Sequence, residues 1–436
     1  MESAIQYITE SERAALLERF LRYVRHWTTS DSGAADSGIQ PSTERQWDFA
    51  RLLANELTLH GVQNVVVTDH CYVHGVLPAS IGFESAASIC LVAHIDTVDE
   101  VSGENVQPQV HTAYDGSPIA LSGGVMLDPA TDSALAAAGA NGETVITADG
   151  STLLGADDKA GIAAIMSAVA YLHEHGEVLH GAIEVLFSPD EETGHGMDHV
   201  PLLRSKCAYT VDGGNIGELE TECFNACKSE LTFTGKAMHT GSARPCMVNA
   251  VTLAATFLSL LPRHEAPETT DGYLGFYAPM SVSATMETAR VTLFLRDFTE
   301  DGMEQRKRTV EQLAQAAVAS VASCQSTGAV TVVHTEQYKN MKAGLERTPA
   351  VVANLVKAYK MAGVPPHFQP IRGGTDGSRL TELGIPTPNI FTGGHNYHSR
   401  SEWCSLEQMA KATEVLLQLA VVTAHDTKGE TNHASV

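Results

Sequence analysis

Residues 89–97 read ICLVAHIDT, an apolar run that ends in a histidine and an aspartate two positions apart. A short apolar run of this kind is typical of a strand buried on both faces of a parallel sheet. Residues 182–192, AIEVLFSPDEE, show the same pattern, with three acidic residues soon after the run. Two such strands predict an open α/β sheet whose ligand site lies at the carboxyl ends of the strands.

The surrounding sequence predicts two structural units. Predicted strands and helices alternate up to about residue 224, apart from residues 103–150, where Pro, Gly and Asp indicate an irregular excursion from the sheet. Residues 225–336 instead show alternating strands and two helices, typical of an antiparallel sheet with one solvated face. The helix–strand pattern then returns. We therefore predict an α/β domain with a mostly parallel sheet, formed by residues 1–224 and 337–436, and an inserted α+β unit, 225–336.

Composition excludes several classes of partner. The 436 residues contain 28 Lys and Arg against 52 Asp and Glu, which gives a net charge of −24. Such a surface repels phosphate backbones and anionic lipid, so we expect neither nucleic acid nor membrane as a partner. The N-terminal residues indicate an amphipathic helix rather than a signal peptide. The eight scattered cysteines are typical of reduced thiols in a cytoplasmic protein.

Acidic residues and histidines recur where predicted strands end or a helix begins. Each alone has a simpler explanation, such as a helix cap, a solvated turn or an exposed loop histidine. Together they are harder to explain structurally, and their nitrogen and oxygen donors suit zinc, and also cobalt or manganese. These residues are His94, Asp96, Asp157, Asp158, Glu191, Glu192, Asp212, His395 and His398.

Longer strings carry a family resemblance. They are LLGADDKAGIA (153–163), PDEE (189–192), YTVDGG (209–214), IRGGTDG (371–377), and FTGG followed by NYH (391–394 and 396–398). With these strings, in this order, the chain resembles the M20 metallopeptidase family and, within it, the tripeptide aminopeptidases. The resemblance runs from about residue 4 to about residue 425. It implies a zinc-exopeptidase-like catalytic domain and a lid or dimerisation role for the inserted unit, which leaves a homodimer open.

The resemblance also implies a ligand set for two metal ions, expected to be zinc with cobalt or manganese as alternatives. His94 and Asp212 are expected to hold one ion, Glu192 and His398 the other, and Asp157 to bridge both. The peptide bond after Asp157 is expected to be cis.

The remaining expected roles concern catalysis and substrate binding. Asp96 is expected to orient His94. Glu191 is expected to act as the general base that removes a proton from water and so forms the hydroxide shared by the two ions. His239, Arg296, Arg372 and Asn396 are expected to contact the substrate, His239 at the oxyanion and the two arginines at a carboxylate. For Arg296, a salt bridge with Asp297 is the competing interpretation.

We therefore predict a cytoplasmic aminopeptidase that releases the N-terminal residue of short peptides, chiefly tripeptides. The alternative is another hydrolase of the same family: a dipeptidase, a carboxypeptidase or an N-deacylase. A non-catalytic binding protein on the same fold is a less favoured hypothesis, because binding alone needs no general base such as Glu191.

Overall fold

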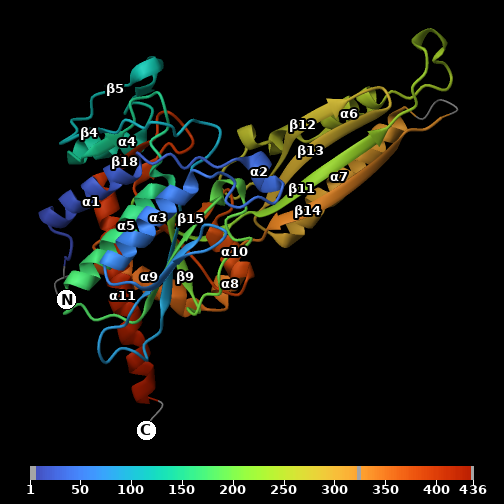
Figure 1. The fold of residues 1–436 in the computed structure, drawn as a ribbon. Helices are drawn as coiled ribbons and strands as arrows, with labels where there is room; N and C mark the ends of the chain where they lie inside the picture. The colour runs from blue at the N-terminus through green and yellow to red at the C-terminus, as the bar shows by residue number, and fades with distance from the viewer. Residues whose placement is uncertain (1–5, 322–325, 434–436) are drawn as a thin grey trace. The chain divides into compact units, whose positions relative to one another are not determined.

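The computed structural model describes residues 6–321 and 326–433, with side chains described up to residue 426, and the chain divides into two compact units (Figure 1). The first unit comprises Met1–Thr221, Ala343–Gln369 and Thr375–Val436, and the second comprises Glu222–Lys342 and Pro370–Gly374. The sequence-based boundaries do not assign the short segment Pro370–Gly374 to the second unit. It belongs there because Arg372 donates hydrogen bonds to the backbone of a loop near residues 270–274.

An eight-stranded mixed sheet forms the centre of the first unit, with strand order β1-β2-β8-β3-β9-β16-β10-β15. Its middle strands, β8, β3, β9 and β16, run parallel, whereas β1 pairs with β2, β2 with β8 and β10 with β16 in antiparallel fashion. The carboxyl ends of the parallel strands therefore lie along one edge. The strands are β1 (Gln63–Val67), β2 (Val73–Leu77), β3 (Ile89–His94), β8 (Ile183–Ser188), β9 (Ala208–Gly213), β10 (Glu218–Cys223), β15 (His367–Ile371) and β16 (Asn389–Phe391).

Helices cover this sheet and bury its central strands. Every residue of β3 and β8 is buried, as expected for parallel strands flanked by helices. Helix α5 packs against β3 and β9, and α1 and α11 pack against α5. The helices are α1 (Glu10–Tyr23), α2 (Ser32–Asp36), α3 (Gln46–Leu59), α5 (Ala156–Glu174), α8 (Lys342–Glu346), α9 (Pro349–Met361), α10 (Asp376–Glu382) and α11 (Leu406–His433).

The excursion at residues 103–150 is more regular than its composition indicates. It contains β4 (Gln109–His111), β5 (Ile119–Ala120), β6 (Met126–Leu127), α4 (Ser133–Asn141) and β7 (Val145–Thr147). The strands β4 and β7 join β17 (Gly394–His395) and β18 (Trp403–Ser405), from near the C-terminus, in a small sheet with order β17-β18-β7-β4. Strands of two or three residues are too short to produce a recognisable sequence pattern.

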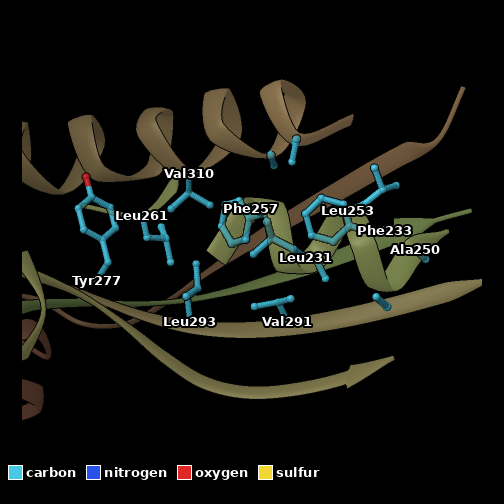
Figure 2. Packing of buried hydrophobic residues seen from close by; sticks show 14 of the residues in the cluster. Leu231, Phe233, Ala250, Leu253, Phe257, Leu261, Tyr277, Val291, Leu293 and Val310 are labelled. Carbon is cyan, nitrogen blue, oxygen red and sulfur yellow. The ribbon is translucent and has the colours of Figure 1, made fainter. Parts of the chain in front are cut away.

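The second unit is a four-stranded antiparallel sheet, ordered β12-β13-β11-β14, that packs against two helices. Figure 2 shows side chains such as Leu231, Phe233, Phe257 and Val310 meeting between the sheet and the helices. The alternation of buried and exposed residues along β11 explains this arrangement. The elements are β11 (Asn225–Thr234), α6 (Ala250–Leu260), β12 (Phe276–Ala284), β13 (Thr288–Asp297), α7 (Glu300–Ser320) and β14 (Ala329–Tyr338).

Within the described part of the chain, none of the helices combines the length and the apolar character needed to span a membrane. Cys71, Cys90 and Cys404 are buried free thiols, whereas Cys324 lies outside the described residues.

Glu184, near the start of β8, is a buried carboxylate that binds backbone. It accepts hydrogen bonds from the N–H groups of Arg204 and Ser205, and its Oε1 lies 3.2 Å from His74 Nε2. Burial raises the pKa of this carboxyl, but the hydrogen bonds from His74, Ser205 and Arg204 outweigh burial and lower the pKa to about 2. The ionised form therefore stabilises the fold.

We expect Glu184→Gln to lower the free energy of unfolding by about 1–3 kcal/mol at pH 7, because buried N–H groups lose a charged acceptor. The pKa of Glu184 is lower in the folded than in the unfolded chain. Its contribution is thus fully present above the unfolded value of 4.5 and is lost as the pH falls towards about 2. Urea unfolding of wild type and Glu184→Gln at pH 7 and pH 3 measures this contribution to the free energy of unfolding. The difference between wild type and variant should narrow at pH 3, and a wider difference there contradicts the assignment.

Candidate metal centre

His94 and Asp212 meet Asp157 at the carboxyl edge of the central sheet. His94 ends β3, and its Nε2 atom lies 2.8 Å from Asp157 Oδ1 and 3.6 Å from Asp212 Oδ1. Asp212 is the penultimate residue of β9, the parallel neighbour of β3, and Asp157 lies in the first turn of α5. The sheet order thus brings together three predicted ligands that are far apart in sequence.

His398 and Glu192 lie against the other oxygen of Asp157. The Nε2 atom of His398 is 3.2 Å from Asp157 Oδ2 and 3.0 Å from Glu192 Oε2. Glu192 belongs to the 3₁₀ turn Glu191–Thr193 after β8, and His398 to the loop between β17 and β18. Asp157 therefore presents one oxygen to each of two histidines, which is the arrangement that a bridging carboxylate requires.

The donor set fits divalent cations. The potential ligand atoms of His94, Asp157 and Glu192 lie within 4.8 Å of one another, and so do those of His94, Asp158 and Asp212. Among the described residues, Glu192 Oε1 is buried without a hydrogen-bond partner. Imidazole nitrogens mixed with carboxylate oxygens are typical ligands of zinc, and buried polar atoms without partners are otherwise costly.

The electrostatics of the site also favour a cation. Burial, and then the neighbouring carboxylate of Asp157, raise the pKa of Glu192 to about 8. Burial raises the pKa of Asp212 to about 6, with the charge of Asp157 adding to the effect. Carboxyl groups this close repel one another when all are ionised, so some of them must hold a proton or share a cation. A metal ion would take the place of those protons.

Asp158 follows Asp157 directly, and its carboxylate, which lies close to His94 and Asp212, also binds backbone. Its carboxylate accepts hydrogen bonds from the backbone N–H groups of His94, at 3.3 Å, and Gly161, at 3.1 Å. The peptide bond between Asp157 and Asp158 is cis, as the resemblance implies. Asp158 therefore acts on the backbone of β3 and α5.

Asp96 connects His94 with the turn that carries Glu191 and Glu192. His94 Nδ1 lies 3.2 Å from the backbone oxygen of Asp96 and 3.4 Å from its Oδ1. The same carboxylate accepts the backbone N–H groups of Glu191, at 3.0 Å, and Glu192, at 3.3 Å. Asp96 is thus placed to orient His94, and it also holds the adjacent acidic turn, which the sequence does not indicate.

The Glu191 carboxyl lies beside the cluster. Burial raises its pKa well above the usual range, and the nearby charges of Asp212 and Asp376 add to this effect, whereas His94 opposes it. Asp376 begins α10, is buried, and is hydrogen-bonded by the Ser188 hydroxyl. A carboxyl with a raised pKa close to a candidate metal centre is suited to accept and return a proton.

Three of the predicted substrate contacts belong to the second unit. His239 is exposed, and its Nδ1 atom accepts the N–H of Gly241. Arg296 donates to Leu295 O and Gln337 Oε1, whereas Asp297 pairs with Arg306 at 2.9 Å. The competing salt bridge between Arg296 and Asp297 is therefore wrong.

Arg372 is already engaged by backbone. Its guanidinium donates to the carbonyl oxygens of Thr270, Gly272 and Leu274 at 2.7–3.2 Å, and it lies over the ring of Phe224. These contacts hold the loop at residues 270–274. Binding of a substrate carboxylate by Arg372 stays a prediction.

Asn396, in the first unit, is also engaged. Its Nδ2 atom donates to Asp132 Oδ2 at 3.0 Å, and the same oxygen accepts the indole N–H of Trp403 at 3.0 Å. Asn396 and His398 both have positive φ, at 55° and 57°. Asp132 therefore ties the excursion at residues 103–150 to the loop that carries His398.

Sequence reasoning missed three buried acidic residues around the centre: Asp190, Asp376 and Glu402. Asp190 accepts hydrogen bonds from Ser42 N and Gln46 Nε2. Glu402 accepts three backbone N–H groups from residues 154–157. Asp190 and Asp376 lie inside the family strings, but nothing in those strings separates a ligand from a residue that holds the backbone.

Comparisons with known proteins found similar peptidases. The model of "Peptidase family M20/M25/M40" matches residues 147–421. A protein of Geobacillus kaustophilus named "Peptidase T" is 42% identical over 408 residues, which cover 93% of this chain and 97% of that protein.

Solved structures share the fold over about 94–95% of this chain. The aminopeptidase PepT of Bacillus cereus superposes with a TM-score of 0.72 at 22% identity, covering 94% of this chain and 99% of that one. A tripeptidase of Staphylococcus aureus gives a TM-score of 0.71 at 19% identity, covering 95% and 99%. At these identities the likeness concerns the fold alone.

Proposed function

The chain belongs to peptidase family M20/M25/M40, and we propose that it is a two-metal aminopeptidase that removes the N-terminal residue of short peptides, chiefly tripeptides. One observation carries the proposal: the two oxygens of Asp157 face different histidines, His94 and His398. The names of the relatives, which include an aminopeptidase and a tripeptidase, support the choice of substrate.

Five side chains are proposed as ligands: His94 and Asp212 for one ion, Glu192 and His398 for the other, and Asp157 for both. Zinc is the proposed metal, with cobalt or manganese as alternatives, because the donors are imidazole nitrogens and carboxylate oxygens. Two divalent cations held there would act as Lewis acids on the scissile carbonyl and lower the pKa of the attacking water.

Glu191 is proposed as the general base. Its carboxylate accepts the proton of the attacking water and then delivers it to the amine that leaves. Asp96 supports this step because its carboxylate accepts the backbone N–H groups of both Glu191 and Glu192. These hydrogen bonds fix the proposed base and a proposed ligand relative to each other.

Four further residues are proposed to take part in substrate recognition. His239 is proposed to stabilise the oxyanion, and Arg296 to bind the peptide carboxylate as a planar fork. The Nη1 atom of Arg296 donates hydrogen bonds to the backbone oxygen of Leu295 and to Gln337 Oε1. Arg372 and Asn396, whose donors are already engaged, are proposed to shape the site around the substrate.

Hydrolysis of trialanine tests the proposed function. We expect the purified protein, loaded with zinc, to release free alanine, and a chelator to abolish the reaction until zinc is restored. N-acetylated trialanine should not be cleaved, because an aminopeptidase requires the free amino group. Cleavage of the N-acetylated peptide would favour a deacylase or carboxypeptidase, and cleavage that survives complete removal of metal would contradict the two-metal proposal.

Adjacent glutamates provide a matched pair of variants. Glu191→Gln should lower kcat for trialanine by about 10²–10⁴-fold, as expected for loss of a general base, while zinc binding is retained. Glu192→Gln should instead weaken zinc binding, because a proposed ligand becomes neutral. Calorimetric titration of metal-free protein with zinc, beside the kinetics, separates the two. Equal loss of zinc affinity in both variants would contradict the assigned roles.

A further inference from the structure

Glu402 is a buried acidic residue to which the proposed reaction assigns no role. It lies four residues after His398, immediately before β18, and only 1% of its surface is exposed. A carboxylate in this position must be compensated by hydrogen bonds or by an opposite charge, because isolated buried charges are strongly unfavourable. Its partners therefore indicate what it does.

All three hydrogen bonds to Glu402 come from the backbone that leads to Asp157. Oε2 accepts the N–H groups of Leu154 and Gly155, each at 2.7 Å, and Oε1 accepts the N–H of Asp157 at 3.1 Å. Hydrogen bonds to an ionised acceptor are shorter and stronger than neutral ones. The two oxygens thus hold the chain on both sides of Ala156.

Lys159 supplies the opposite charge. This lysine is 2% exposed, and burial lowers its pKa to about 8, whereas the nearby charges of Glu402 and Asp96 favour its ammonium form. Its Nζ atom lies 3.2 Å from the position that a Cβ on Gly155 would occupy, so it packs directly against the same loop. Glu402 and Asp96 each hold the backbone of one ligand-bearing loop, and the Lys159 ammonium offsets the charge of both.

We propose that Glu402 is a positioning residue that fixes the bridging Asp157 relative to His398. His398 and Glu402 belong to the same loop, and Glu402 binds the backbone of Asp157, so this loop supplies one predicted ligand and sets the place of another. The consequence is that each Asp157 oxygen keeps its own histidine, at 2.8 Å from His94 and 3.2 Å from His398. The inference rests on the proposed two-metal function.

Glu184 provides a matched control. It is equally buried, accepts backbone N–H groups from Arg204 and Ser205, and lies at the opposite end of β8 from Glu191. Glu402→Asp and Glu184→Asp both keep the carboxyl group and shorten the side chain by one methylene group. A purely structural role predicts similar consequences for both variants.

The test is a calorimetric titration of each metal-free protein with zinc, accompanied by thermal unfolding and trialanine kinetics. Wild type and Glu184→Asp should each bind two zinc ions, and the affinities measured for the variant should equal those of wild type. Glu402→Asp should bind at least one ion about 10–100-fold more weakly, as is usual when a residue that supports metal ligands is changed. Its kcat at limiting zinc should fall while KM changes little.

Wild-type zinc affinity in Glu402→Asp would overturn the inference. Failure of Glu402→Asp to fold under conditions where Glu184→Asp folds would also overturn it, because Glu402 would then serve the fold rather than the centre. If wild type itself binds no divalent ion, the proposed function fails and the inference fails with it. The wild-type titration therefore distinguishes the two failures.

Discussion

The crowding of carboxylates at one edge of the central sheet is the constraint on which the structure depends. Parallel strands end side by side, so His94 on β3, Asp212 on β9 and the Glu191–Thr193 turn after β8 converge on the start of α5. The resulting negative charge is buried, and burial strengthens its mutual repulsion. Only protons or cations can relieve that repulsion, and two histidines facing one carboxylate favour cations.

A second set of buried acidic residues keeps this arrangement in place. Asp96, Asp158, Asp190 and Glu402 accept backbone or side-chain hydrogen bonds. Asp96, Asp158 and Glu402 each hold the backbone of a predicted ligand, whereas Asp190 holds Ser42 and Gln46. The buried acids near the centre thus divide into those with hydrogen-bond donors as partners and those left for metal. This division explains how one small region accommodates so many carboxyl groups.

The sequence predicted much of this centre, because apolar runs that end in acids or histidines mark the carboxyl ends of buried strands. The resemblance to the M20 family assigned His94, Asp157, Glu192, Asp212 and His398 to one centre, and the structure brings them within contact distance. The sequence could not predict the residues that hold the backbone. Glu402 binds residues almost 250 positions earlier, and the pairing of β18 with β7 that brings them together rests on strands of three residues. Arg296 also showed that a neighbour in sequence, Asp297, need not be a partner in space.

The central claim is that Asp157 lies between two metal ions, and diffraction at the zinc absorption edge tests it most directly. Crystals of the protein grown with zinc should show two anomalous peaks, one beside His94 and Asp212 and the other beside Glu192 and His398, with Asp157 contacting both. A single peak, or peaks remote from Asp157, would contradict the account.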